Sequence, residues 1–319
     1  MGARRSGTFW AFWELMHKLF EEGKRPPLIV LENVRGLLNG DDFGGLIEAM
    51  VALGLQVGAV VMDAKKFVPQ SRPRVFIVGV DSRVEVDELF TGIHGESEWF
   101  TNRLLRAHDE LSDDVLKQWR WWKIPVPKEP VKPVEKLIDR EPSGVDWFAE
   151  EKTNRLISLM NERHLGKLKE LQDDPDRRVG FVYRRTRSGE QRAEIRIDGL
   201  AGCLRTPSGG SSRQFVVECD NGQTRARLLS AREAARLMGV PDTFQLPDNY
   251  TDGYHAMGDA VAVPVVYWLS RHLLLPLAER ANGQIRREGE RSSRRHFQSV
   301  SEMDVSRRAV SMASHWKCP

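Results

Sequence analysis

The sequence predicts an α/β protein that combines half of a doubly wound sheet with a smaller second domain. The first observation is an unbroken apolar run at residues 28–34, which ends abruptly in a carboxylate and an amide. Such a run is typical of a strand buried on both faces of a parallel sheet. The second is the alternation of helix and strand patterns as far as residue 80. The third is a change of composition after about residue 81, where charged residues, tryptophans and prolines become frequent.

The first eighty residues divide into helix and strand patterns that support this class. An apolar stripe with helical spacing predicts a helix at 8–22, with Ser6 or Thr8 as its N-cap and Gly23 as its end. A second helix and three strands complete the predicted half sheet. They are expected as strand 28–34, helix 43–54 and strands 57–62 and 75–80, the last two joined by a loop at 69–74.

The rest of the chain predicts a mixed second domain, a returning helix and a tail. Helical spacing, alternation around basic residues and turn-forming pairs indicate these elements. They are helix 153–172, a basic hairpin over 179–198 turning at Ser188-Gly189, a hairpin turn at Asn221-Gly222, and helices 230–239 and 260–278, the last with Pro264 near its start and Pro276 near its end. The Arg- and Ser-rich residues 281–319 lack periodicity and are expected to be disordered.

Composition and charge describe a globular protein without a transmembrane segment. The 319 residues are 40% hydrophobic and 29% charged, and no apolar run approaches the length needed to cross a bilayer. The net charge is +3, of which residues 281–319 contribute eight Lys/Arg against four Asp/Glu. Any nucleic-acid-binding face must therefore come from local clustering. Three widely spaced cysteines indicate reduced thiols in a cytosolic or nuclear compartment and do not form a metal-binding cluster, and we expect a cytoplasmic protein.

Glu32 is the first candidate for chemistry. It lies at the carboxyl end of a predicted strand, where open α/β sheets place their ligand-binding crevice. A partly desolvated carboxyl group in such a crevice can share or donate a proton. The alternative is a strand whose terminal glutamate simply meets solvent.

Four further segments follow at characteristic spacings. They are Pro69-Gln70-Ser71-Arg72-Pro73-Arg74, Arg205 to Ser211, Ser230 to Pro241 and Gly258 to Pro264. Together with Glu32-Asn33-Val34, this set resembles the C-terminal half of the DNA cytosine-5 methyltransferase family, over residues 8–278. The resemblance implies part of a Rossmann-like S-adenosylmethionine-methyltransferase sheet and a smaller target-recognition domain. The implied division is 1–80 for the catalytic lobe, 81–255 for target recognition, 256–280 for a helix returning to the catalytic lobe, and 281–319 for a basic tail.

The resemblance implies a specific chemistry. The family attacks C6 of a flipped cytosine with a cysteine thiolate, so that C5 can take a methyl group from S-adenosylmethionine. Glu32 would hydrogen-bond or protonate N3 of the ring, and Asn33 would orient the neighbouring backbone. Arg72 and Arg74 share one face of an extended segment. They would hold the O2 edge of the base, pair with Glu32 or position a thiolate.

The resemblance also implies binding residues. Asp259, Ala260 and Val261 would line the cofactor pocket, although the family more usually has asparagine in place of Asp259. The DNA-binding residues would be Arg205, Gly209, Gly210, Ser211 and Arg213, whose glycines allow close approach to phosphate. Arg232 and Glu233 fall in a motif of structural character. The tryptophans at 119–122 are expected to form a local core rather than a base-stacking platform, and no metal site is expected.

The family's Phe-x-Gly-x-Gly cofactor loop, ribose-binding acid and Pro-Cys nucleophile do not occur in this sequence, where no cysteine precedes Glu32. We therefore expect a truncated chain or one subunit of a split enzyme, inactive alone. Its partners would be double-stranded DNA, with association to the nucleoid, and a complementary N-terminal methyltransferase polypeptide, not a membrane. Strand 28–34 would have an open apolar edge, so the isolated chain should be insoluble without its partner.

Two other hypotheses stay open. One is a catalytically dead DNA-binding relic or regulatory subunit that keeps target recognition. The other is an unrelated α/β nucleotide-binding protein whose motifs match by chance. A nearby coding frame for Pro-Cys would favour a working split enzyme over the DNA-binding relic. Loss of DNA binding on mutating the arginines of residues 179–213 would exclude the unrelated nucleotide-binding protein.

Overall fold

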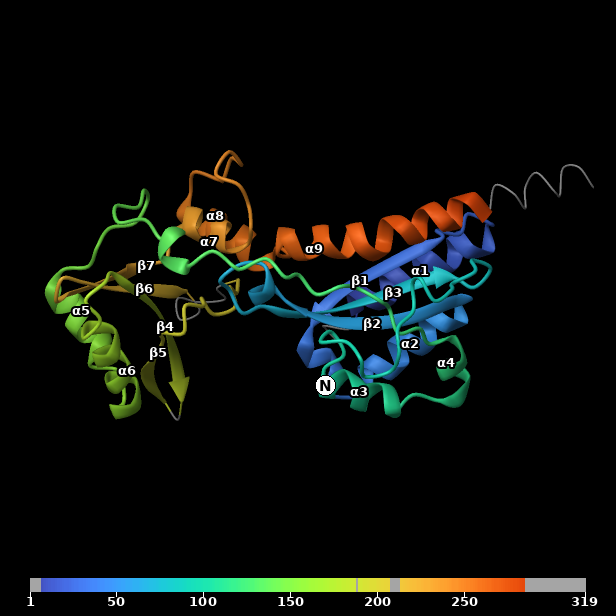
Figure 1. Cartoon of the computed structure of the whole chain (residues 1–319), viewed down its shortest axis with the longest axis horizontal. Helices are drawn as coiled ribbons and strands as arrows, with labels where there is room; N and C mark the ends of the chain where they lie inside the picture. The colour runs from blue at the N-terminus through green and yellow to red at the C-terminus, as the bar shows by residue number, and fades with distance from the viewer. Residues whose placement is uncertain (1–6, 188, 207–212, 285–319) are drawn as a thin grey trace, which may run out of the picture.

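A computed structural model describes residues 7–187, 189–206 and 213–284, which form two lobes (Figure 1). Ser6, the turn residue Ser188 and the tail beyond residue 284 lie outside the described residues. The first lobe contains α1 (Gly7–Glu21), β1 (Leu28–Val34), α2 (Asp42–Ala52), β2 (Leu55–Asp63), β3 (Pro73–Asp81), α3 (Asn102–Asp109), α4 (Asp113–Gln118) and α9 (Val263–Leu269). The second contains α5 (Glu150–Ile157), α6 (Glu162–Gln172), β4 (Arg178–Arg187), β5 (Glu190–Arg196), β6 (Gln214–Asp220), β7 (Gln223–Leu228), α7 (Ala231–Leu237) and α8 (Tyr250–Asp259).

The sheet of the first lobe has the strand order β1-β3-β2, and β3 runs antiparallel to both neighbours. The connection between β2 and β3, residues 64–72, is too short for the helical crossover that a parallel pair requires. The α/β class is confirmed, whereas the expectation that residues 28–34 are buried on both faces of a parallel sheet is wrong. β1 is an edge strand in the described part of the chain, and Val30 and Val34 are exposed.

The tryptophan cluster packs on this first sheet. Trp122 is fully buried, and its indole Nε1 donates to the Val78 carbonyl of β3 (3.2 Å). Gly58 on β2 allows this approach, because a Cβ there would lie 1.8 Å from the Arg120 carbonyl oxygen. Trp119 is also buried in the same hydrophobic core. The expectation of a local core is therefore confirmed for Trp119 and Trp122.

The second lobe is built on a four-stranded antiparallel sheet with the order β5-β4-β6-β7. The predicted hairpin at residues 221–222 joins β6 to β7, and Asn221 (φ 48°) and Gly222 (φ 76°) adopt the left-handed conformation of a tight hairpin turn. The other predicted hairpin is formed by β4 and β5. Helices α5 and α6 pack on one face of this sheet and enclose a second hydrophobic core.

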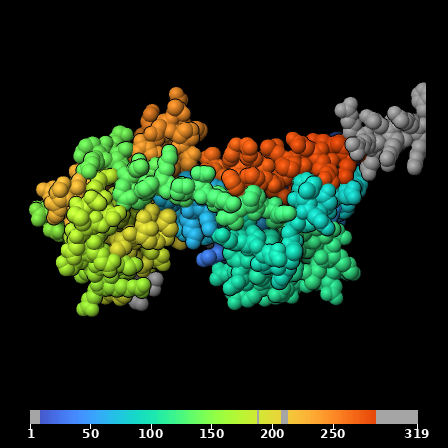
Figure 2. Space-filling model, viewed as in Figure 1, coloured from blue at the N-terminus to red at the C-terminus, as the bar shows by residue number. Residues whose placement is uncertain are grey.

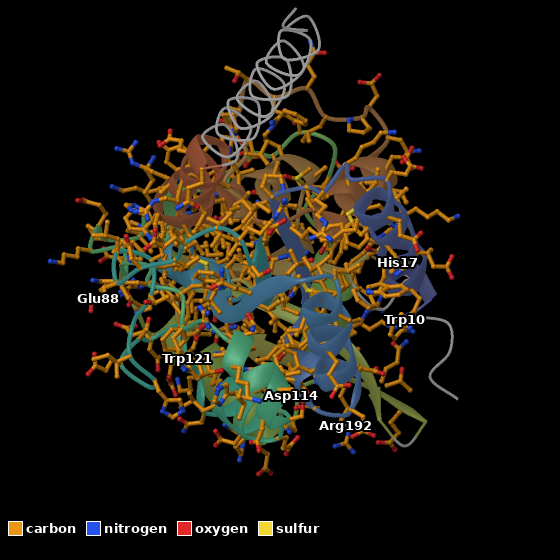
Figure 3. All side chains as sticks on the ribbon, turned by 90° about the vertical axis from the view of Figure 1, so that its right-hand side faces the viewer. Trp10, His17, Glu88, Asp114, Trp121 and Arg192 are labelled. Atoms are coloured by element: carbon orange, nitrogen blue, oxygen red, sulfur yellow. The ribbon has the colours of Figure 1, made fainter. Side chains whose placement is uncertain are left out.

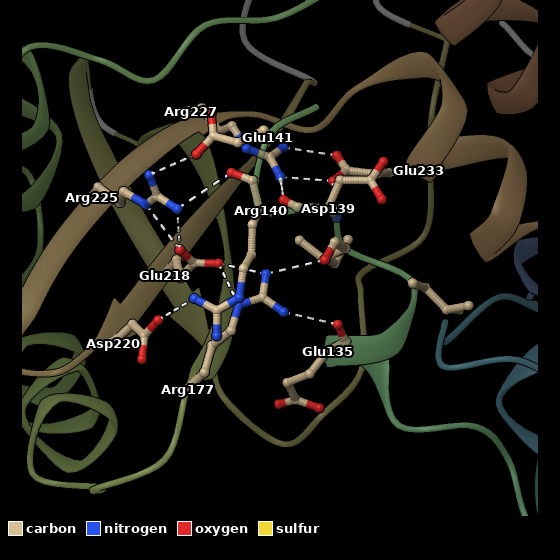
Figure 4. Close-up of polar contacts among 12 residues, drawn as sticks. Glu135, Asp139, Arg140, Glu141, Arg177, Glu218, Asp220, Arg225, Arg227 and Glu233 are labelled. Carbon is tan, nitrogen blue, oxygen red and sulfur yellow. Dashed lines mark hydrogen bonds and ion pairs between the residues drawn. The ribbon is translucent and has the colours of Figure 1, made fainter. Parts of the chain in front are cut away.

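A buried ionic network fastens the second sheet to α7 and to the preceding linker (Figure 4). Arg227 on β7 forms a bidentate ion pair with Glu233 on α7, at 2.8 and 2.7 Å, and both side chains are fully buried. Glu233 also completes a capping box with Ser230. On β6, the buried Glu218 accepts from Arg177 and Arg225. The structural role expected for Glu233 agrees with these contacts.

The chain then returns to the first lobe along α9, which lies on the opposite side of the sheet from α3 and α4 (Figure 1). Pro264 lies in the first turn of α9, where proline needs no hydrogen-bonded N–H. A π-turn at Ser270–Leu274 follows, in which the Leu275 N–H bonds to the Ser270 carbonyl. Pro276, which lacks an N–H, comes directly after this widened turn.

One segment of the described chain, Tyr250–Gln284, meets the length and composition of a membrane-crossing helix, with 28% of its most apolar window buried. It is not one regular helix, because α8 ends at Asp259 and Ala260 is extended (φ −67°, ψ 161°) before α9 begins at Val263.

Candidate functional site

Glu32 and Arg74 form an ion pair at one end of the first sheet. In the register of β1 and β3, Arg74 is paired with Val34, which makes Glu32 its diagonal neighbour on the same face. Arg74 Nε lies 2.8 Å from Glu32 Oε1, and the two side chains are 14% and 30% exposed. Asn33 Oδ1 accepts the Val34 N–H (2.8 Å), which fixes the end of β1. The pairing of β1 with β3 therefore holds the two side chains together, while both remain partly exposed to solvent.

Arg72 lies just before β3 and is buried, with 3% of its surface exposed. Its Nη1 donates to the Leu204 carbonyl (2.7 Å). Its Nη2 donates to the carbonyls of Gly258 (2.9 Å) and Ala260 (2.6 Å). Burial lowers the pKa of the Arg72 guanidinium, and the nearby charge of Arg74 lowers it further. Arg72 therefore joins three separate segments of the chain at one point.

Cys203 lies between the two arginines. Its Sγ is 3.5 Å from Arg72 Nη1 and 3.8 Å from both Nη1 and Nη2 of Arg74. The thiol is half-buried. The expectation that Arg72 and Arg74 share one face agrees with this common contact. No sequence motif identified Cys203 as a site residue; the available signal was its position two residues before Arg205.

A cleft of about 720 Å³ opens beside this group, between the two lobes. Figure 2 shows the molecule hollowed between the lobes. The cleft is lined by the carboxyl ends of β4 and β5, the start of β3, the first residue of β6, Arg35 just after β1, and the loop at 202–205. Among the described residues the lining contains Cys203 and no carboxylate, and its basic members are Arg35, Arg184, Arg185, Arg196 and Arg205. Such a surface attracts polyanions.

Two of these arginines are oriented by carboxylates just outside the lining. Arg196 binds Asp198 through two contacts, at 2.6 and 2.8 Å, and this hydrogen bonding raises the pKa of Arg196. Arg185 lies 3.4 Å from Glu194 and over the Tyr183 ring. The basic alternation at 179–198 was the sequence signal for these residues, whereas Arg35 carried no recognisable signal.

The predicted DNA-binding residues do not all lie together. Arg205 is exposed and lines the cleft. Arg213 instead turns to α8, where its Nη2 donates to Thr251 Oγ1 (3.1 Å) and its guanidinium lies over the Tyr250 ring. Gly209, Gly210 and Ser211 lie outside the described residues.

The predicted cofactor residues lie at the junction of α8 and α9. Asp259 accepts a hydrogen bond from the Thr206 hydroxyl, and the Ala260 carbonyl accepts from Arg72. Ala260 and Val261 are half-buried. The polar groups of Asp259 and Ala260 are thus already bound within the protein, so these residues do not by themselves fit a complete S-adenosylmethionine site.

The structure thus combines an α/β fold with an arginine-lined cleft, which is a surface of the kind that attracts polyanions. The family model of the C-5 cytosine-specific DNA methylase matches residues 1–274. The chain belongs to this family, and the resemblance seen in its motifs is confirmed.

Two relatives and one solved structure illustrate the similarity. Type II methyltransferase M.BsuFI of Bacillus subtilis is 26% identical over 248 residues, which cover 76% of this chain and 46% of that protein. Type II methyltransferase M.MspI of Moraxella sp is 25% identical over 260 residues, covering 80% and 48%. The structure of S. pombe Dnmt2 methyltransferase covers 86% of this chain and 73% of that chain, with 17% identity and a TM-score of 0.45. The chain spans about half the length of these two curated relatives.

Proposed function

We propose that this chain is the part of a DNA cytosine-5 methyltransferase that binds DNA and polarises the flipped cytosine. The observation that carries the proposal is the Glu32–Arg74 ion pair (2.8 Å), which Cys203 connects to a cleft lined by five arginines. A guanidinium-lined cleft neutralises phosphate charge, while a carboxyl group held at its end supplies acid–base chemistry.

The proposed roles follow from the contacts. Because Oε1 of Glu32 is bound by Arg74, its other oxygen, Oε2, faces N3 of the base and shares a proton with it. Arg74 holds the carboxyl group in place. Arg72 is a positioning residue, since both of its terminal nitrogens donate to backbone carbonyls and it fixes the segments that carry Cys203 and Ala260. Arg205, Gly209, Gly210, Ser211 and Arg213 form the proposed DNA-contacting segment.

S-adenosylmethionine is the proposed cofactor, and it supplies the methyl group when bound. Asp259, Ala260 and Val261 would form only one wall of its site, because Thr206 and Arg72 already bind the polar groups of this segment. The main cofactor loop and the Pro-Cys nucleophile would come from a polypeptide segment other than the described residues.

We propose that a complementary methyltransferase polypeptide binds the open edge of β1. The edge presents exposed Val30 and Val34. Nearby α9 presents three more exposed apolar side chains, Val263, Val266 and Tyr267. A partner strand would satisfy the unpaired backbone groups of β1 and cover these side chains. The chain's coverage of about half of its relatives supports this choice of occupant.

The proposed domain division follows the sequence. Residues 1–80 and 256–280 form the catalytic lobe and residues 81–255 the target-recognition domain, except that residues 99–124, with α3 and α4, pack on the first sheet and are assigned to the catalytic lobe. We place the protein in the cytoplasm, on the nucleoid, since chromosomal DNA is its proposed substrate.

The first experiment sequences the DNA upstream of the Met1 codon and co-expresses this chain with any frame encoding Phe-x-Gly-x-Gly and Pro-Cys. Transfer of labelled methyl groups from S-adenosylmethionine to DNA should appear only with both polypeptides. Glu32→Gln should lower that rate by about 10²–10⁴-fold with unchanged DNA affinity. Glu14→Gln, an exposed carboxylate on α1, is the control. An equal rate in Glu32→Gln would refute the role of Glu32.

A second candidate is a DNA-binding relic without methyl transfer. Asp259 and Ala260 favour this candidate, because they are already hydrogen-bonded to Thr206 and Arg72. A cofactor-binding segment that no longer binds cofactor would have its polar groups bonded within the protein in this way. DNA binding that persists without methyl transfer, in the presence of the complementary polypeptide, would establish this candidate over the enzyme.

A further inference from the structure

Two histidines and an aspartate come together in the first lobe, away from the proposed catalytic site. They are His94, in the loop before α3, and His108 and Asp109, at the end of α3. One ligand atom from each lies within 4.8 Å of the others. His108 Nδ1 and Asp109 Oδ1 are 3.1 Å apart. Helix α3 packs on β2, whereas Glu32 lies on β1 at the other edge of the sheet.

Trp121 supports both imidazole rings. Its ring centroid lies 4.9 Å from that of His94 and 4.6 Å from that of His108. Trp119 packs against His108 from another side, at 5.1 Å. His108 is thus held between two indole rings, whereas the exposed His94 contacts only one of them and can still turn toward His108.

The backbone also fixes the loop that carries His94. The Gly92 N–H donates to the Trp121 carbonyl (2.6 Å), and the Lys123 N–H donates to the Phe90 carbonyl (2.8 Å). The loop is therefore attached to the tryptophan segment immediately before His94. Gly95, at φ +80°, supplies the turn on the other side of His94.

We propose that His94, His108 and Asp109 bind a divalent transition-metal ion, with Zn²⁺ as the best fit. Imidazole and carboxylate together suit Zn²⁺, whereas Ca²⁺ and Mg²⁺ require mainly oxygen ligands. In a tetrahedral zinc site, ligand atoms stand about 3.3 Å apart. The His108–Asp109 distance of 3.1 Å already matches this, and the exposed His94 closes the remaining gap by a side-chain rotation. Water completes the coordination.

The bound ion has a structural consequence. It joins the loop before α3 to the end of α3, and this bond adds to the contacts around Trp121. Binding to the folded state alone raises the melting temperature in proportion to the logarithm of metal concentration. The site is independent of DNA binding, because none of its three residues lines the cleft.

The test is titration calorimetry of ZnCl₂ into the full chain, prepared without a histidine tag. One ion should bind per chain, and His94→Ala and His108→Ala should each weaken binding at least tenfold. His17→Ala is a matched control, because His17 also stacks on a tryptophan (Trp13, 5.0 Å) beside a carboxylate, Glu21, but is not grouped with a second histidine. Figure 3 shows His17 and Trp121 well separated on the molecule.

A second readout guards against misfolded variants. Zn²⁺ should raise the melting temperature of the unsubstituted chain and of His17→Ala, but not that of His94→Ala or His108→Ala. All four proteins should melt alike after chelation, since His94 is exposed and His108 only half-buried. Equal zinc affinity in His94→Ala, or binding that is lost only when Cys203 and Cys219 are alkylated, would overturn the proposal.

Discussion

At the scale of single residues, Arg72 and Arg74 are the same residue type two positions apart, but they make different contacts. They alternate in sequence and both contact Cys203. Arg72 is buried and donates to three backbone carbonyls, whereas Arg74 reaches Glu32 near solvent. The planar five-donor guanidinium of Arg72 suits this multiple contact, and a lysine ammonium could not reproduce its geometry.

Arg72→Lys should therefore destabilise the protein much more than Arg74→Lys. Removing the hydrogen bonds to the carbonyls of Leu204, Gly258 and Ala260 should lower the free energy of unfolding by about 2–3 kcal/mol. Arg74→Lys keeps a charge near Glu32 in a partly exposed site and should cost less than about 1 kcal/mol. Urea denaturation measures both, and equal reductions would contradict the positioning role of Arg72.

At the scale of elements, the buried pair of Arg227 on β7 and Glu233 on α7 joins a sheet to a helix. Arg227→Met leaves a buried carboxylate without its partner and should cost about 3–5 kcal/mol. Adding Glu233→Gln removes the charge but keeps an acceptor for the helix cap, so the double variant should be more stable than Arg227→Met. Thermal unfolding compares them.

The control for this pair is an exposed ion pair of the same network. Arg140 contacts Asp220 at the surface. Arg140→Met should therefore destabilise the protein far less than Arg227→Met does. A destabilisation as large as that of Arg227→Met would show that burial does not determine the strength of these pairs.

The edge strand β1 gives a second prediction at this scale. Val30→Lys places a charge on the open apolar edge, which should reduce aggregation of the isolated chain and prevent assembly with the complementary polypeptide. Leu165→Lys, at an exposed apolar residue on α6, should do neither. Light scattering and co-purification provide the measurements. If the unsubstituted chain is monodisperse and unfolds cooperatively, the prediction that the open edge of β1 causes aggregation is wrong.

At the scale of the whole molecule, the cleft between the lobes is the proposed DNA-binding surface. Removing one arginine that neutralises a phosphate should make the slope of log K against log salt concentration shallower by about 0.9. Arg205→Ala and Arg35→Ala should each show this change in a fluorescence titration with duplex DNA. Arg192→Ala, an exposed arginine of β5 outside the cleft lining, should leave the slope unchanged.

Several features of fold and site were predictable because their causes are local. The helices at 8–22 and 43–54 follow from apolar spacing, and the hairpin at Asn221-Gly222 follows from the left-handed turn these residues favour. The partnership of Glu32 with Arg74 was one of several roles considered. The cleft was not predictable as a whole, since Arg35 and Arg196 approach each other only after the lobes have formed.

The sequence by itself determined the family and the α/β class, because motif spacing and apolar runs are properties of neighbouring residues. The tertiary structure decided that β3 lies between β1 and β2, and the short loop after β2 made the β2–β3 pair antiparallel. It also decided that Arg72 acts on the backbone while Arg74 holds Glu32, and that His94 meets His108 over Trp121. These outcomes depend on distances between residues remote in sequence, which only packing of the folded chain sets.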